Sequence, residues 1–389
     1  MRFWNHFLNL RIIKLSGIFY KSPSNFNYWY NFGFLAMFCL ILQMLTGIIL
    51  SMFYKADILI AHVLVISITN ELYYGWFLRS LHANGASFFF LIVYLHMARG
   101  IYYSSYVYPR QFVWLTGSLI WVLMIVTAFT GYILPWGQMS FWGAMVITNL
   151  VAAIPLIGDD LVYLLWGGFT VGTATLERFY TIHFCMPFII FMLSYVHFAL
   201  LHEYGSTNPL GLSVATDEIP FVPYYGIKDL FSVTFVLAIF FFFLFFYPLA
   251  LGHSDNLIEA NFLVTPPHIV PEWYFLPLYC ILRSVPNKLM GLILIVLFIL
   301  SIFLLPFLNK GIIKSSLFKP YHTLFVWIFF SVCLLLGWIG GLPVIYPFYT
   351  FGQVLTFLYF FILLIIFPFL NFLETAIYLS YVQKNINKK

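Results

Sequence analysis

Long apolar stretches alternate with short polar connections along most of the chain. Eight stretches are long enough for a bilayer-spanning helix, which needs about 20 mainly apolar residues; they cover residues 32–53, 77–103, 111–134, 179–201, 229–250, 289–308, 321–341 and 348–370. The pattern predicts an all-α, polytopic membrane protein with eight transmembrane helices. An even number of spans places both ends of the chain on one side of the membrane.

Two connections are too long and too apolar for simple loops. Residues 135–178 and 251–288 are rich in Gly, Pro and Trp, which indicates short helices at the outer membrane interface. The polar stretch 202–228 follows the fourth span, and no later span carries a pair of histidines. We therefore expect two domains: an N-terminal four-helix bundle, residues 1–210, and a C-terminal bundle, residues 211–389, which carries the outer segment 251–288.

Composition and charge support a membrane protein and set its orientation. The chain is 63% hydrophobic and 8% charged, whereas soluble domains are about 25% charged. With both termini inside, the inner face holds most of the Lys and Arg, and the outer face only Lys55, Arg79, Arg178, Arg283 and Lys288. This bias follows the positive-inside rule. No basic run carries interleaved aromatic residues, so we expect no nucleic-acid partner, and the start Met1–His6 lacks the pattern of a cleaved signal peptide.

Four histidines repeat at one spacing in two of the predicted spans. His82 and His96 lie fourteen residues apart in the second span, as do His183 and His197 in the fourth. Fourteen residues turn a helix by about 1400°, close to four full turns, and advance it about 21 Å. Each pair therefore lies on one helix face at two depths. Because the two spans run in the same direction, we expect His82 opposite His183 near the outer side and His96 opposite His197 nearer the inner side.

Two imidazoles at each level indicate haem more strongly than another metal site. Neutral imidazole binds zinc, copper and haem iron, but zinc takes four protein ligands or an open site. Two ligands with no carboxylate or thiolate beside them fit six-coordinate haem. A different class of protein, a transporter whose histidines relay protons, stays open as the alternative.

Glycines and polar side chains near the histidines fit the haem hypothesis. The first and third spans also carry pairs fourteen residues apart, which would leave room for a porphyrin edge: Gly33, Gly47, Gly117 and Gly131. Arg79 precedes His82 by three residues and Arg99 follows His96 by three, where they would meet haem propionates, although both could simply mark the membrane edges. Gln43 and Ser105 are weaker candidates of the same kind.

Four stretches of the chain resemble cytochrome b of the respiratory ubiquinol:cytochrome c oxidoreductase. They are Arg79-Ser-Leu-His82-Ala-Asn-Gly-Ala-Ser87, Gly131-Tyr-Ile-Leu-Pro-Trp-Gly-Gln-Met-Ser-Phe-Trp-Gly-Ala144, Gly205-Ser-Thr-Asn-Pro-Leu-Gly211 and Pro271-Glu-Trp-Tyr-Phe-Leu-Pro277. The resemblance implies two non-covalent b-type haems, one of low potential on His82 and His183 and one of high potential on His96 and His197. It also implies ubiquinol oxidation outside, ubiquinone reduction inside and coupled proton translocation.

The same resemblance implies two quinone sites. At the outer site Glu272 would accept a quinol proton, because an apolar setting raises a carboxyl pKa; it could instead cap a helix. Phe129, Tyr132, Gly143 and Tyr279 would line this pocket. At the inner site His202, Ser206 and Asp229 would bind quinone and Lys228 would deliver protons, although these residues could also form an ordinary polar loop.

The resemblance further implies the surroundings of the chain. Expected partners are the Rieske iron–sulfur protein, cytochrome c1 and other complex III subunits, in a homodimeric complex. We expect the mitochondrial inner membrane with both termini on the matrix side; a bacterial plasma membrane is the alternative. Tyr30, where many members have Trp, and residues 252–256, which lack the usual Pro, depart from the family. A dihaem subunit that anchors a dehydrogenase is a second alternative.

Overall fold

The computed structural model describes residues 20–212, 217–309 and 311–387. It is mostly helical, and eight helical segments in these residues are long and apolar enough to cross a membrane. The predicted all-α fold with eight spans is confirmed. The expectation that no signal peptide begins the chain concerns Met1–His6, which lie outside the described residues.

The eight candidate spans are built from long helices, the last of them continuous through a π-helical turn. Their bounds are α2 Phe32–Ser51 (preceded by the 3-10 turn η3 Tyr28–Tyr30), α4 Gly75–Tyr102, α5 Gln111–Ile133, α8 Thr173–Tyr204, α9 Tyr224–Phe246, α11 Lys288–Leu308, α12 Pro320–Gly340, and α13 Phe348–Phe361 with η8 Ile362–Ile366 and α14 Phe367–Ile386.

Short elements fill the connections. They are β1 Lys21–Pro23, α3 Ala61–Asn70, α6 Gln138–Leu150, η4 Val151–Ala153, α7 Gly158–Trp166, β2 Glu218–Pro220, η5 Ser254–Leu257, η6 Trp273–Phe275, α10 Leu276–Arg283 and η7 Ser316–Phe318. The short helices expected in 135–178 and 251–288 are present. Helix α3 and the antiparallel pairing of β1 with β2 are additions that the apolar pattern did not predict.

The last span extends well past the predicted end at residue 370. Asn371 and Glu374 end the apolar run in the sequence, but both side chains are buried. Glu374 Oε1 accepts hydrogen bonds from the backbone N–H groups of Tyr321 and His322 at the start of α12. Because these polar groups have partners inside the protein, the helix continues to Ile386.

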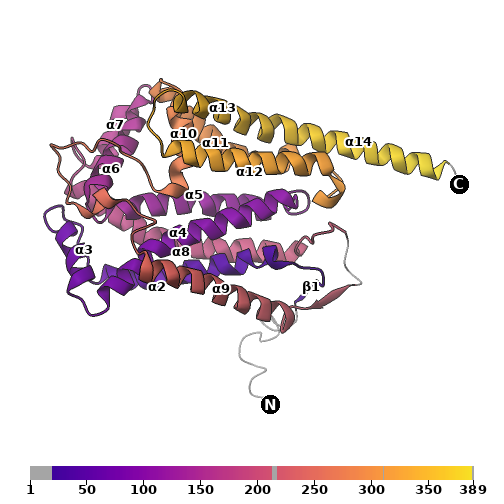
Figure 1. The fold of residues 1–389 in the computed structure, drawn as a ribbon, viewed down its shortest axis with the longest axis horizontal. Coiled ribbons are helices and arrows are strands. Elements are labelled where there is room, and N and C mark those ends of the chain that lie inside the picture. Colours follow the sequence, from indigo (N-terminus) through magenta and orange to yellow (C-terminus); the bar gives the residue numbers. More distant parts are fainter. Residues whose placement is uncertain (1–19, 213–216, 310, 388–389) are drawn as a thin grey trace, which may run out of the picture.

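The long helices lie roughly along one axis, with short elements at the ends (Figure 1). The closest helix pairings are α5 with α8 and α2 with α4 among the earlier helices, and α12 with α10 and α13 among the later ones. Helices α3, α6 and α7 lie at one end of the molecule, whereas β1 and the free end of α14 lie towards the other. The first and last described residues are therefore at the same end of the bundle.

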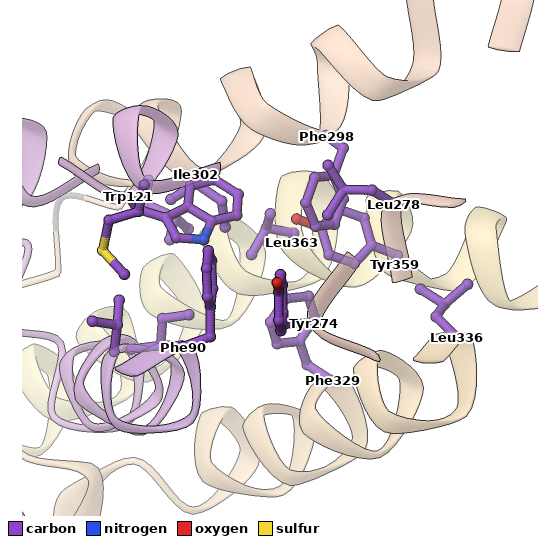
Figure 2. Close-up of a cluster of buried hydrophobic side chains, with 14 of the residues drawn as sticks. Phe90, Trp121, Tyr274, Leu278, Phe298, Ile302, Phe329, Leu336, Tyr359 and Leu363 are labelled. Carbon is purple, nitrogen blue, oxygen red and sulfur yellow. The ribbon is translucent and has the colours of Figure 1, made fainter. Parts of the chain in front are cut away.

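One apolar core joins the earlier and later helices. Figure 2 shows aromatic side chains meeting across this contact. The ring of Phe90 on α4 stacks on Tyr274 with centroids 4.2 Å apart, and Trp121 on α5 packs near Phe298 on α11. Such packed aromatic pairs stabilise by burial and by ring geometry. The position of the domain boundary, between residues 210 and 211, stays a prediction.

Candidate functional site

Four histidines face one another in two pairs. His82 and His96 lie on α4, and His183 and His197 on α8. The ring centroids of His82 and His183 are 6.1 Å apart, and those of His96 and His197 are 6.4 Å apart. The structure thus brings together the two pairs that the fourteen-residue spacing predicts.

The ring separations suit one metal ion between each pair. A metal–imidazole bond is about 2 Å and a ring nitrogen lies about 1.1 Å from its centroid, so two axial imidazoles have centroids about 6.2 Å apart. In the described ranges no third His, Cys, Asp or Glu side chain joins either pair to form a larger metal-binding group. Each level therefore offers two axial ligands, and a macrocycle with its own four nitrogens, such as haem, would supply the rest.

Hydrogen bonds at the outer pair select the metal-binding form of both rings. The Thr46 hydroxyl donates to the carbonyl of Leu42, which leaves its oxygen free to accept from His82 Nδ1 at 2.9 Å. His183 Nδ1 lies 2.8 Å from the carbonyl oxygen of Thr127, which can only accept. Both rings therefore carry the proton on Nδ1, and both Nε2 atoms keep the lone pair that binds a metal.

The inner pair is held differently. His197 Nδ1 lies 3.1 Å from the hydroxyl oxygen of Thr116. Because that hydroxyl donates to the carbonyl of Phe112, its oxygen accepts from His197, as the Thr46 oxygen accepts from His82 at the outer level. His96 Nδ1 lies 3.1 Å from Arg99 Nη2. Because a guanidinium only donates, His96 accepts on Nδ1 and carries its proton on Nε2. Metal binding through His96 Nε2 would therefore require Arg99 to release Nδ1.

Each of the four predicted glycines faces one of these rings. A Cβ on Gly131 would overlap the ring of His183, and one on Gly117 would lie 2.9 Å from His197 Cε1. The corresponding Cβ distances are 3.0 Å from Gly47 to His82 and 3.4 Å from Gly33 to His96. Glycine thus leaves room for the imidazoles; room for a porphyrin edge stays a prediction.

The polar candidates lie near the histidine levels. The Arg99 guanidinium carbon lies 4.9 Å from the ring centroid of Tyr30, one of the positions that depart from the family. Gln43 Nε2 is buried without a hydrogen-bond partner among the described residues. Ser105 Oγ lies 3.0 Å from Thr207 Oγ1. Arg79 is half-buried on α4. It lies close enough to Glu272 to lower the pKa of the Glu272 carboxyl.

An apolar pocket lies at the end of the molecule that carries α6 and α7. It holds about 520 Å³ of empty space, its open mouth included, a size typical of small-molecule pockets. All five outer-site candidates line it: Phe129, Tyr132, Gly143, Glu272 and Tyr279. Nothing lies within 4 Å of where a Cβ on Gly143 would be. Tyr279 is fixed by a 2.9 Å hydrogen bond from its hydroxyl to the carbonyl of Ile269.

Glu272 is the titratable carboxyl of this pocket. Burial raises its pKa to about 7, while the neighbouring Tyr132 hydroxyl and the Arg79 guanidinium act in the opposite direction. The Tyr132 hydroxyl faces the carboxyl but forms no hydrogen bond of normal geometry. A carboxyl with a pKa near neutrality can both take and release a proton at physiological pH.

Two of the four inner-site candidates, His202 and Lys228, contact residues 20–31 at the opposite end. The ring of His202 stacks on Tyr20 with centroids 4.1 Å apart. Lys228 Nζ donates to the carbonyl of Phe26 at 2.7 Å, and Asp229 beside it is buried. The backbone carbonyl of Ser206 accepts a hydrogen bond from Arg110. Within the described ranges no hydrogen bond joins these four side chains to one another.

Three threonines were missed by the sequence reasoning. Thr46, Thr116 and Thr127 fix the proton positions on His82, His197 and His183. A signal existed for two of them, since Thr46 and Thr116 each directly precede one of the spaced glycines. Thr127 acts through its backbone carbonyl, a group that every residue has, so the sequence gives no signal for it. His62 Nδ1 lies 3.1 Å from the carbonyl oxygen of Pro135.

Comparison with known proteins gives consistent matches over nearly the whole chain. The family described as Cytochrome b/b6/petB matches residues 18–205, and that described as Cytochrome b(C-terminal)/b6/petD matches residues 259–360. Cytochrome b of Cyanidium caldarium is 53% identical over 94% of this chain and 95% of the relative. Cytochrome b of Dictyostelium citrinum is 48% identical over 95% of this chain and 96% of the relative.

A solved structure has the same fold. A chain of the "Hyperthermophilic respiratory Complex III" superposes with a TM-score of 0.90 and 34% identity, over 96% of this chain and 99% of that one. These matches set aside the transporter and the dehydrogenase anchor. They show a multi-pass, haem-binding subunit of a multi-subunit oxidoreductase complex. The chain belongs to the cytochrome b family and is the cytochrome b subunit of a respiratory complex III.

Proposed function

We propose that this chain is a catalytic subunit that oxidises ubiquinol in the outer pocket and reduces ubiquinone near the inner end of the bundle. The observation that carries the proposal is the pair of imidazole levels, whose ring separations of 6.1 and 6.4 Å suit one metal ion between each pair of rings. His82 and His183 would hold the outer haem, and His96 and His197 the inner haem. Bound there, the two b-type haems would supply one-electron redox chemistry at two depths of the membrane.

The residues around the histidines would set their ligand state and neutralise propionates. Thr46 and the Thr127 carbonyl keep the outer rings in the metal-binding tautomer. At the inner level Arg99 would turn from His96 Nδ1 towards a propionate, which frees that nitrogen to hold its proton. Arg79 would neutralise a propionate of the outer haem. Gln43 has an amide nitrogen without a partner among the described residues, and Ser105 has a hydroxyl for further contacts.

Quinol oxidation would take place against Glu272. Ubiquinol loses two protons and two electrons on oxidation, and the ionised Glu272 would accept one proton. Phe129 and Tyr279 would pack on the quinone ring, and Gly143 leaves the space that the ring requires. One electron would go to the partner Rieske iron–sulfur protein, which must reach this end of the chain, and the other to the haem that His82 and His183 would hold. Both protons would be released on the outer side.

Quinone reduction would take place between the end of α8 and the start of α9. His202 and the protonated carboxyl of Asp229 would donate to the two quinone carbonyls, and Ser206 would add a hydroxyl. Lys228, held by the Phe26 carbonyl, would pass protons from the inner aqueous phase. Proton release outside and proton uptake inside together translocate charge across the membrane.

The complex would lie in the mitochondrial inner membrane with both termini on the matrix side. Cytochrome c1, the other complex III subunits and a second copy of the complex would complete the assembly. Within the chain, residues 1–210 would form the dihaem domain and residues 211–389 the domain that brings the segment 251–288 to the quinol.

Haem content tests the proposal directly. The purified complex should release two non-covalent b-type haems per copy of this chain into acid acetone. His183→Leu should remove one and leave the other. A single haem per chain in the wild-type complex, or two haems in the variant, would contradict the proposed ligation.

A further inference from the structure

A buried lysine lies where the later helices meet the inner end of the earlier bundle. Lys319, directly before α12, is 1% exposed. Its Nζ donates to Ser104 Oγ at 2.6 Å and to Asn371 Oδ1 at 3.3 Å. In the described part of the chain no carboxylate lies within ion-pair distance of it. Its direct partners are neutral oxygens, and the buried Glu374 carboxyl acts on it only from beyond ion-pair distance. A buried cation without a direct ionic partner is costly to keep, which suggests a role besides stabilising the fold.

Both partners of Lys319 are themselves fixed. The Asn371 amide nitrogen donates to Asn309 Oδ1 at 2.7 Å, which orients its oxygen towards the lysine. Ser104 is buried and has φ of 49°, a left-handed conformation that is unusual for a residue other than glycine. Such a conformation persists only where the surroundings hold it. The charged hydrogen bond from Lys319 is one such restraint on the turn between α4 and α5.

The residue before Ser104 leads to the inner histidine level. The Tyr103 hydroxyl accepts a hydrogen bond from Asn27 at 3.0 Å, and its ring packs against Tyr30 with centroids 5.7 Å apart. The Tyr30 ring also stacks on Phe26 and contacts the guanidinium of Arg99, which in turn contacts His96. An unbroken series of contacts therefore runs from the lysine of the later helices to an inner ligand.

The residue after Ser104 leads to the inner quinone segment. Ser105 Oγ lies 3.0 Å from Thr207 Oγ1, and Thr207 adjoins Ser206 on the segment after α8. The turn is also tied to the later helices by the Ser316 hydroxyl, which donates to the Tyr102 carbonyl. A shift of Ser104 would thus move the residues on both sides of it.

We propose that Lys319 is a positioning residue of the inner haem: by holding Ser104 in its left-handed conformation, it fixes the Tyr103, Tyr30 and Arg99 contacts beside His96. The proposal rests on the proposed ligation of haem by His96 and His197. It assigns to the C-terminal half of the chain a part in setting the potential of a cofactor that the N-terminal half binds. The outer haem should not depend on Lys319.

Redox titration of the b haems in the assembled complex tests this proposal. Lys319→Gln should lower the midpoint potential of the inner haem and leave that of the outer haem unchanged, because the Arg99 guanidinium, which rests against the Tyr30 ring, loses its fixed position near the inner haem. Lys319→Arg keeps a buried multiple donor and should restore the wild-type value in large part. Lys314→Gln is the matched control: this half-exposed lysine lies in the same connection and donates no hydrogen bond within the described residues.

A second variant separates positioning from the charge itself. Glycine adopts a left-handed conformation without strain, so Ser104→Gly added to Lys319→Gln should recover most of the inner potential if Lys319 acts through the turn. No recovery would overturn the positioning role, as would equal shifts of both haems or no shift in Lys319→Gln. A wild-type complex without two b haems would instead contradict the proposed function.

Discussion

The outer and inner histidine levels have the same spacing but different hydrogen bonding. At the outer level, both Nδ1 atoms face acceptors, the hydroxyl of Thr46 and the carbonyl of Thr127. At the inner level, His96 Nδ1 faces the donor Arg99. The hydrogen bonds at the outer level therefore hold both imidazoles in the tautomer that binds a metal. At the inner level, His96 reaches that tautomer only when the Arg99 side chain turns away.

The two proposed quinone sites differ in a parallel way. The outer residues line one pocket of about 520 Å³ with a single carboxyl. At the inner site, His202 and Lys228 contact residues 20–31. Within the described chain, no hydrogen bond joins the side chains of the four inner candidates to one another. The outer end is organised by the packing of the chain itself, while the inner end has polar groups whose final positions would depend on the bound molecules.

Loss of a ligand should have the largest effect on this comparison. His183→Leu should remove the outer haem and His96→Leu the inner haem, each with a loss of turnover of about 100-fold or more, since loss of a ligand costs more than loss of a residue that hydrogen-bonds to a ligand. The measurement is a reduced-minus-oxidised spectrum with haem content per chain. Loss of both haems from either variant in a complex of normal abundance would show that the levels are not independent.

Alanine at the glycines should distinguish the levels next. Gly131→Ala would overlap the ring of His183, whereas Gly33→Ala would leave a 3.4 Å contact with His96. Overpacking costs about 1–3 kcal/mol, so the first variant should lose outer haem and the second should keep both. Equal haem loss in both variants would contradict the contacts that the structure gives.

Glu272→Gln should slow quinol oxidation by about 100-fold, within the range of general-base effects. The raised pKa, about 7, means that the carboxyl is protonated and unable to accept below pH 7 and ionised above it. The wild-type rate should therefore rise with pH through about 7, and the variant should lack this rise. The matched control is Glu259→Gln, an exposed carboxylate of the same outer segment. An unchanged pH profile in Glu272→Gln would assign the proton to another group.

The smallest effects should come from the threonines. Thr46→Val removes the acceptor for His82 Nδ1, and Thr116→Val does the same for His197. Substitution of a residue that hydrogen-bonds to a metal ligand typically costs about 10–100-fold in metal affinity. Thr46→Val should therefore shift the potential of the outer haem and weaken its binding, and Thr116→Val should do the same to the inner haem. Redox titration of each variant checks this. A shift at the opposite level would argue against the assigned hydrogen bonds.

Local patterns in the sequence predict much of this structure. The spans follow from apolar runs, and the histidine pairs follow from a spacing that a helix turns into one face. Helix α3 and the β1–β2 ribbon were not predicted. The ribbon joins Lys21–Pro23 to Glu218–Pro220, segments with no shared local signal.

Contacts between distant residues set the remaining features. Lys319 and Ser104 are 215 positions apart, and neither residue has a neighbour in sequence that indicates the contact. Asn371 and Glu374 look like the polar end of a membrane span, yet both are buried and the helix continues. The residues of the outer pocket are predictable because the family pattern already groups them. The hydrogen bond between Arg99 and His96 depends on how the two side chains are oriented in the fold.

The most direct test of two bis-histidine haem levels is a potentiometric titration of the oxidised complex followed by visible and electron paramagnetic resonance spectra. The account predicts two b-type haems per chain with separate midpoints, both low-spin in the oxidised state because each iron has two imidazole ligands. One haem per chain, or a high-spin signal from either haem in an intact complex, would contradict it.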